Sequence, residues 1–263
     1  MGKADNEHTQ KRVEEESDRY GDIVIGDFPD NYENLTIKGI FGLKWLSMYC
    51  KNVKYAIKAD DDAFLNIFKM LNLMNRYEDH KRVVMCGLWT VMPILRDSNK
   101  CMKWCVRYSE FPGRQLFPKY CAGVTYTLSR EIVDDMYSYA SKTPFFWIDD
   151  VYITGLLLGK TKNVEYINLL RNITLREKRA LDQYLNSSIP EQSLFYFSHV
   201  RKPANMGILF RAAIERQDSS MLAQLNHTIV SSVLGTHSRL VKSLTPPKQR
   251  SSAGVWKIRR LKV

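Results

Sequence analysis

Hydrophobic and polar positions along the first half of the chain alternate between a strand-like and a helix-like period. Short apolar or alternating runs, typical of strands, occupy residues 22–25, 53–58, 82–89 and 121–128. Between and after them, apolar side chains three or four residues apart predict helices over 35–50, from Phe64 to Met74, and after Ser129 as an N-cap. The order strand, helix, strand, helix, strand predicts an α/β domain with a mainly parallel sheet.

Three adjacent carboxylates, Asp60, Asp61 and Asp62, interrupt this pattern directly after the strand at 53–58. Open α/β sheets bind ligands at the carboxyl ends of their strands, and Mg²⁺ and Mn²⁺ prefer carboxylate and phosphate oxygens. Extended geometry would turn Asp60 and Asp62 to one side and Asp61 to the other. The alternative is a solvated acidic turn. The chain has no P-loop or G-x-G-x-x-G pattern, which favours a metal as the holder of a phosphate group.

A second pair of carboxylates, Asp149 and Asp150, precedes an apolar helical run that ends near Gly159. One interpretation is an ordinary acidic helix start, which the helix dipole favours. The other is a general base whose pKa is raised toward working pH by the apolar side chains of residues 145–147. The residues by themselves leave both interpretations open.

The net charge of +11 belongs mostly to the C-terminal end of the chain. No Asp or Glu follows Asp218, whereas eight of the 39 basic residues do. Residues 1–218 therefore carry 31 basic and 28 acidic residues, a net charge of +3. A nearly balanced body argues against nucleic acid as a partner, and so against a metal-dependent nuclease or polymerase-like protein. Residues 218–263, basic and interrupted by two prolines, are expected to form a flexible tail.

Cysteine and asparagine motifs point to the secretory pathway. The five cysteines, an odd number, leave at least one thiol free if the others pair. The spacing of Cys101 and Cys105 could belong to a zinc ligand pair, but no matching Cys or His pair follows, so disulfide bonding or burial is favoured. Asn-x-Ser/Thr sequons predict N-glycosylation at Asn34, Asn172, Asn186 and Asn226.

Five segments within residues 20–210 carry a family resemblance. In order they are YGDIVIGDFPDNYENLTIKGIFGLKWLSMYC, YAIKADDDAFLN, KWCVRYSEFPGRQLFPKYCAGVTYTLSR, IDDVYITG and FSHVRKPANM. Together they resemble the family of β-1,3-galactosyltransferases and β-1,3-N-acetylglucosaminyltransferases. The resemblance implies a GT-A type nucleotide-sugar fold. It also implies a metal-dependent, inverting transfer of galactose or N-acetylglucosamine from a UDP-sugar to a glycan acceptor on a glycoprotein or glycolipid, in β-1,3 linkage.

Carried over position by position, the resemblance gives each candidate residue a role. Asp62 would bind Mn²⁺ or Mg²⁺ directly, with Asp60 beside it and His199 completing the metal site. Asp60 and Asp61 would contact the donor sugar nucleotide. Asp150 would be the base that deprotonates the acceptor hydroxyl.

The resemblance also sets expectations for the whole protein. The full-length form would be anchored in the Golgi membrane with its catalytic domain in the lumen. Residues 1–217 would form that domain without its first strand and upstream anchor, and residues 218–263 would form the tail. Asp149 stands where the family has Glu, and Cys105 where it has Tyr. The alternative function is a catalytically silent, glycan-binding relative without a complete donor site.

Overall fold

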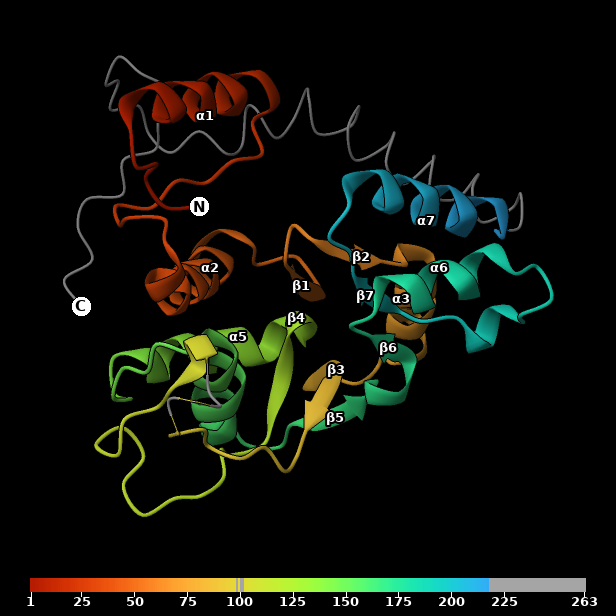
Figure 1. The fold of residues 1–263 in the computed structure, drawn as a ribbon. Coiled ribbons are helices and arrows are strands. Elements are labelled where there is room, and N and C mark those ends of the chain that lie inside the picture. The colour runs from red at the N-terminus through yellow and green to blue at the C-terminus, as the bar shows by residue number, and fades with distance from the viewer. Residues whose placement is uncertain (98, 100–101, 218–263) are drawn as a thin grey trace.

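A four-stranded sheet forms the centre of the fold, with helices on both of its faces (Figure 1). The structure, a computed structural model, describes residues 1–97, 99 and 102–217, so the expected tail and Asn226 lie outside the described residues. The helices are α1 (Glu7–Tyr20), η1 (Tyr32–Asn34), α2 (Leu35–Tyr49), α3 (Ile67–Arg76), η2 (Met102–Trp104), α5 (Arg130–Ala140), η3 (Val151–Leu157), η4 (Leu158–Lys160), η5 (Leu170–Asn172), α6 (Glu177–Leu185), η6 (Glu191–Ser193) and α7 (Pro203–Glu215). The strands are β1 (Tyr55–Ala59), β2 (Ala63–Leu65), β3 (Val83–Trp89), β4 (Tyr120–Ser129), β5 (Glu165–Asn168), β6 (Ile173–Thr174) and β7 (Phe197–His199). None of the described helices has both the length and the apolar character of a transmembrane span.

The central sheet has the strand order β1-β4-β3-β5 and is mixed. β4 runs antiparallel to both β1 and β3, whereas β3 and β5 are parallel. The prediction of an α/β fold is confirmed, but the prediction of a mainly parallel sheet is wrong. A parallel strand needs a crossover connection, usually a helix. The described part of the connection from β3 to β4 contains the short helix η2 and no long crossover helix, and β4 enters the sheet in the reverse direction.

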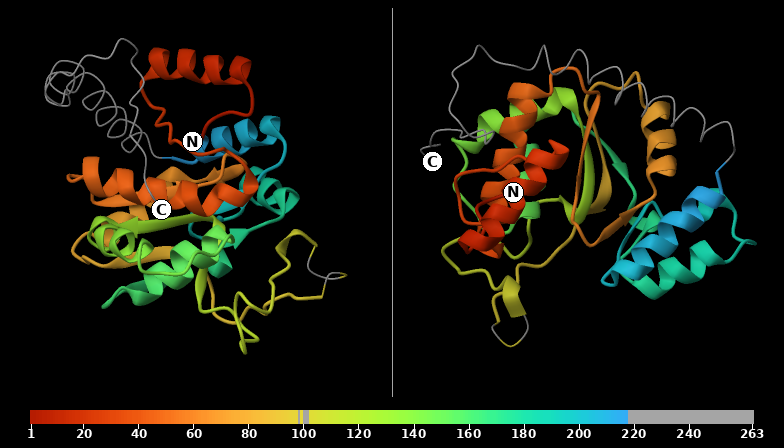
Figure 2. Two further views of the ribbon diagram at one scale, coloured as in Figure 1. Left: turned by 90° about the vertical axis from the view of Figure 1, so that its left-hand side faces the viewer. Right: turned by 90° about the horizontal axis from the view of Figure 1, so that it is seen from above.

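Alternate residues of β3 face two separate parts of the core. Val84 and Cys86 belong to the cluster formed with α2, α5 and η3, whereas Val83 and Met85 belong to the cluster formed with α3. The right-hand view of Figure 2 shows α2 and α5 on one side of the sheet and α3 on the other. Because both faces are covered, β3 is buried along almost its whole length, which explains its uninterrupted apolar sequence.

A smaller sheet of order β2-β7-β6 adjoins the central one and packs with α6 and α7 (Figure 1). β2 is antiparallel to β7, and β6 is parallel to it. Phe64, which the apolar pattern placed in a helix, lies instead on β2 opposite Ser198 and packs against Tyr184 of α6. This small sheet brings the segment after Asp62 beside the segment that contains His199.

Of three further local predictions, one is wrong, and two are right in position but differ in detail. Residues 22–25 form no strand, although the carbonyl of Val24 accepts a hydrogen bond from the nitrogen of Met1, and the N–H of Gly26 donates one to the carbonyl of Met1. Ser129 is the N-cap residue of α5, as predicted, but its hydroxyl accepts a hydrogen bond from the N–H of Val83 (2.8 Å) and makes no capping hydrogen bond. The apolar run after Asp150 is helical and ends near Gly159, as predicted, in the form of a π-helix followed by a 3₁₀ turn.

Candidate active site

Asp60, Asp61 and Asp62 occupy the tight turn between β1 and β2. The N–H of Ala63 donates to the carbonyl of Asp60 (3.1 Å), which closes a four-residue turn. The segment is therefore a turn and not extended, and the carboxylates of Asp60 and Asp62 contact different partners, Lys58 and a histidine of β7. The side chain of Asp61 is exposed.

Asp62 and His199 meet although 137 positions separate them. The antiparallel pair of β2 and β7 sets Ala63 opposite His199, and the carbonyl of Asp62 accepts a hydrogen bond from the N–H of Val200 (2.7 Å). In this register, Nε2 of His199 lies 2.7 Å from Oδ2 of Asp62. The structure thus brings together two of the residues that were predicted as metal ligands.

The donor atoms of this pair suit a divalent ion. Mn²⁺ accepts both carboxylate oxygen and imidazole nitrogen, and the two atoms are close enough to bind one ion. Within the described residues, no group of three or more His, Cys, Asp or Glu side chains is arranged to hold a metal. An ion held by Asp62 and His199 would take its remaining ligands from water or substrate phosphates, as Mg²⁺ commonly does.

Lys58 links the strand-end turn to β4. Its ammonium group donates to the carboxylate of Asp60 and to the carbonyl of Gly123, and it lies 5.9 Å from the ring centroid of Tyr126. The antiparallel register of β1 and β4 sets Lys58 opposite Tyr126 and so makes these contacts possible. The sequence analysis gave Lys58 no role, because a polar residue on a half-buried strand carries no signal for a partner 65 positions away.

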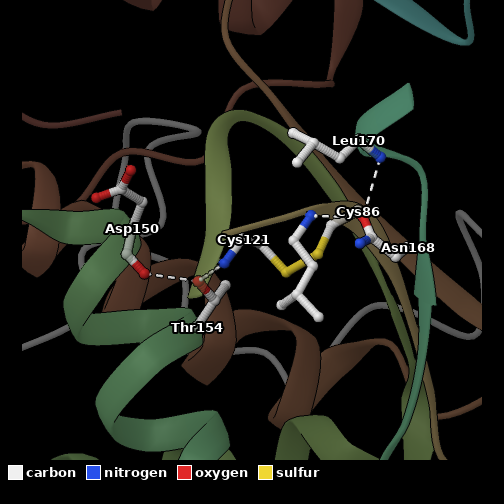
Figure 3. Close-up of a disulfide and its surroundings, with 7 residues drawn as sticks. Cys86, Cys121, Asp150, Thr154, Asn168 and Leu170 are labelled. Atoms are coloured by element: carbon white, nitrogen blue, oxygen red, sulfur yellow. Dashed lines mark hydrogen bonds between the residues drawn. A yellow bond between two sulfur atoms is a disulfide. The ribbon is translucent and has the colours of Figure 1, made fainter. Parts of the chain in front are cut away.

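Asp150 stands at the start of η3, tied to the neighbouring strand (Figure 3). Its Oδ1 atom accepts a hydrogen bond from the N–H of Val151 (2.8 Å). Its backbone carbonyl accepts one from the hydroxyl of Thr154 (2.6 Å), whose oxygen accepts one from the N–H of Cys121 (2.9 Å). Cys121 is disulfide-bonded to Cys86 of β3. The helix start is thereby fixed to β4, and β4 to β3.

The electrostatic environment of Asp150 favours its protonated form. Burial, and next the charge of Asp149, raise the pKa of Asp150 to about 7, although Lys58 and backbone N–H groups oppose the shift. Burial likewise raises the pKa of Asp149. The buried phenol of Tyr126 has its pKa raised by burial and then by Asp149, Asp150 and Asp60, so these three carboxyl groups gather around one side chain. Asp150 can therefore take up and release a proton near neutral pH.

Gly123 provides the space in which the Asp150 carboxylate lies. A Cβ atom at Gly123 would stand 3.2 Å from Oδ2 and 3.3 Å from Cβ of Asp150. The sequence analysis did not select this glycine, although a glycine inside a predicted strand is a known sign of close approach by another group.

The cysteine and sequon predictions have mixed outcomes. Cys86–Cys121 is a disulfide, Cys105 is also disulfide-bonded, and Cys50 is a free thiol, as the odd number of cysteines required. The sequon residues that the structure describes differ in exposure: Asn186 is exposed at the end of α6, whereas Asn34 and Asn172 are half-buried.

The sequence profile of the family described as Galactosyltransferase matches residues 1–169, which include the strand-end aspartates and Asp150. The chain belongs to this family. Galactosyltransferase family membership is therefore confirmed for the part of the chain that carries Asp60 to Asp62 and Asp149–Asp150, while His199 lies beyond the matched residues.

Named relatives of this galactosyltransferase-family chain agree with the match. It is 30% identical to human "Beta-1,3-galactosyltransferase 5" over 161 residues, which cover 61% of this chain and 50% of the relative. It is 32% identical to human "UDP-GalNAc:beta-1,3-N-acetylgalactosaminyltransferase 1" over 154 residues, covering 57% and 44%. It is 30% identical to mouse "Beta-1,3-galactosyltransferase 1" over 161 residues, covering 61% and 48%. The chain spans about half the length of the curated relatives it matches.

Proposed function

We propose that this protein is an inverting, metal-dependent β-1,3-hexosyltransferase that uses a UDP-sugar as donor and a glycan as acceptor. The observation that carries the proposal is the position of Asp150. Its half-buried carboxylate, with a pKa of about 7, lies against Gly123, and Lys58 joins Gly123 to Asp60 of the turn that holds three aspartates. The mixed α/β architecture, with carboxylates at a strand end, is compatible with a GT-A type fold. The relatives named above are, by name, transferases of galactose or N-acetylgalactosamine, which supports the reaction class. Either sugar is a candidate donor, and N-acetylglucosamine is the third candidate.

Each carboxylate has a separate role in this proposal. Asp62 and His199 would hold the Mn²⁺ or Mg²⁺ ion, and Asp60 and Asp61 would contact the donor. The bound ion would neutralise negative charge on the diphosphate leaving group. Asp60 is already neutralised in part by Lys58, which keeps its carboxylate on the β4 side of the turn.

Asp150 is the proposed base. The acceptor hydroxyl oxygen attacks the anomeric carbon of the donor from the face opposite UDP, and the bond between that carbon and the diphosphate oxygen breaks. The hydroxyl proton passes to the carboxylate of Asp150, and UDP leaves with the bonding electron pair. A single displacement of this kind inverts an α-linked donor to a β-linked product and needs no nucleophilic Ser or Cys.

The proposed cellular site is the Golgi lumen, with the full-length protein anchored in the membrane. The disulfide between Cys86 and Cys121 supports this site, because disulfides persist in the oxidising secretory pathway and are rare in the cytosol. Immunofluorescence of the full-length protein with a Golgi marker would check the location.

A transfer assay tests the function directly. The full-length protein would be incubated with Mn²⁺ and, separately, the UDP-sugars of galactose, N-acetylgalactosamine and N-acetylglucosamine, with β-linked disaccharide acceptors. We expect transfer with one donor, loss of transfer with EDTA, and a β-1,3 linkage in the product. Acceptor binding without transfer from any donor would identify the silent, glycan-binding relative instead.

A further inference from the structure

Two exposed aromatic rings from distant parts of the chain lie together on the surface. Tyr32 of η1 and Trp104 of η2 are joined by a hydrogen bond from Nε1 of Trp104 to the hydroxyl of Tyr32 (3.0 Å). The ammonium group of Lys103 lies 4.2 Å from the centroid of the Tyr32 ring and 5.0 Å from that of Trp104. We call Tyr32, Lys103 and Trp104 the aromatic platform.

The aromatic platform is exposed and yet ordered by its own contacts. Tyr32 is 44% exposed and Trp104 43% exposed, so large apolar surfaces remain in water. Single exposed aromatic residues are common, but paired rings held by a hydrogen bond and a shared cation form a preorganised surface. A ligand that binds a preorganised surface loses less conformational free energy than one that must order it.

The core beneath the aromatic platform is the same core that positions Asp150. η1 leads into α2, where the hydroxyl of Thr36 donates a buried hydrogen bond to the carbonyl of Phe146 (2.9 Å). Phe146 precedes Asp150 by four residues, a span of at most about 14 Å. Val106, two residues after Trp104, is buried in the same core cluster as Phe146. The two halves of the platform are therefore fixed beside the segment that ends at the proposed base.

The aromatic platform also lies apart from the proposed metal ligands. Asp62 and His199 are carried by β2 and β7, whose side chains pack in the other two core clusters with α3, α6 and α7. The donor diphosphate would bind on that side of Asp150. The surface formed by η1 and η2 therefore remains available to the acceptor.

The chemistry of the aromatic platform fits a pyranose ring. A pyranose has an apolar face of C–H groups, which can stack on an aromatic ring, and a rim of hydroxyl groups. Trp104 and Tyr32 supply the rings, and the Lys103 ammonium, which lies over both rings, supplies hydrogen-bond donors. We infer that the aromatic platform binds the acceptor glycan, through the sugar ring next to the one that carries the reactive hydroxyl. This inference rests on the proposed function.

Kinetics with matched variants test the inference. In the full-length protein, we expect Trp104→Ala to raise the KM for a disaccharide acceptor by about tenfold or more. Its rate of UDP-sugar hydrolysis without acceptor should be unchanged, because the platform does not touch the donor. The matched control is Tyr108→Ala, which removes an aromatic ring that is 77% exposed and stacked on Arg96 outside the platform. Tyr32→Phe, which keeps the ring and removes the hydrogen-bond acceptor, should show a smaller increase.

Direct binding separates this inference from the proposed function. Saturation-transfer NMR would be recorded with β-linked disaccharides ending in galactose, N-acetylgalactosamine or N-acetylglucosamine. We expect wild type and Tyr108→Ala to bind one probe and Trp104→Ala to bind it at least tenfold more weakly. Absence of hydrolysis and transfer in wild type would refute the proposed function while this binding result still stands.

Three outcomes would overturn the inference that the aromatic platform binds the acceptor. The first is equal binding by Trp104→Ala and wild type, and the second is no binding of any probe by wild type. The third is binding that appears only in Asn34→Gln, since that would mean that a glycan of the chain itself, attached at the neighbouring sequon, covers the rings.

Discussion

The carboxylate of Asp150 lies against the backbone of Gly123, where a Cβ atom would stand 3.2 Å from Oδ2. The contact joins the start of η3 to β4, and the same glycine accepts a hydrogen bond from Lys58 through its carbonyl. Gly123 is thus the backbone position at which the proposed base, its neighbouring cation and the central sheet meet.

Gly123→Ala is expected to displace the Asp150 carboxylate and reduce transfer by about tenfold or more, because a base must hold its position to take up the proton. The matched control is Gly42→Ala in α2, where an added Cβ has no neighbour within 4 Å. That change should leave transfer intact and raise stability by about 0.5–1 kcal/mol, since alanine favours a helix over glycine. Steady-state kinetics and thermal unfolding of both variants provide the measurement. Equal activities would show that the contact does not position the base.

Asp150→Asn is expected to reduce transfer by roughly 10²–10⁴-fold while the affinity for the UDP-sugar stays the same, the usual effect of removing a positioned base. In wild type, kcat/KM should rise with pH through about 7, because the base acts in its ionised form. Asparagine can still accept the hydrogen bond from the N–H of Val151, so the helix start should remain folded. Normal transfer by folded Asp150→Asn would refute the assignment.

Asp150 also makes a prediction about stability. Its folded pKa, about 7, lies above the ordinary value of 3.8, so the folded state binds more protons between these two values. The stability that this group contributes is present below pH 3.8 and is lost as pH rises toward 7, with a slope of at most about 1.4 kcal/mol per pH unit. Relative to wild type, Asp150→Asn should therefore become more stable as pH rises from 5 to 8. Urea unfolding at both pH values measures this difference. A constant difference would mean that Asp150 titrates at its ordinary pKa.

Lys58→Met should move the acid limb of the pH–rate profile to higher pH. The positive charge of Lys58 lowers the pKa of Asp150 and Asp149, so its removal raises both. Lys58→Arg keeps the charge and should keep the limb near its wild-type position. If methionine and arginine shift the profile equally, the effect comes from lost packing and not from lost charge.

Asp62→Ala should abolish Mn²⁺-dependent binding of UDP, and His199→Ala should weaken it, because their side chains supply the two adjacent donor atoms. Calorimetric titration of UDP with and without Mn²⁺ measures the metal-dependent part. The control is His80→Ala: His80 pairs with Glu165 on the surface and lies outside the strand-end turn. Metal-dependent affinity that survives in Asp62→Ala would refute the metal assignment.

The sequence by itself determined the elements that are apolar along most of their length. α2 and β3 were predicted almost to the residue, because a long apolar run that packs in the core retains its character whatever surrounds it. The strand-end position of Asp60 to Asp62 followed from the same patterns. The role of Asp150 as a base came from the family resemblance, since its residues alone favoured an ordinary helix start.

Only the tertiary structure decided which strands pair and which side chains meet. The reversed direction of β4 follows from the form of its connection to β3, and no local period records it. The contacts of His199 with Asp62, and of Lys58 with Gly123, depend on strand registers between segments 137 and 65 positions apart. Burial, which raises the pKa of Asp150, is likewise a property of the packed molecule, because water leaves a carboxylate only when distant parts of the chain close over it.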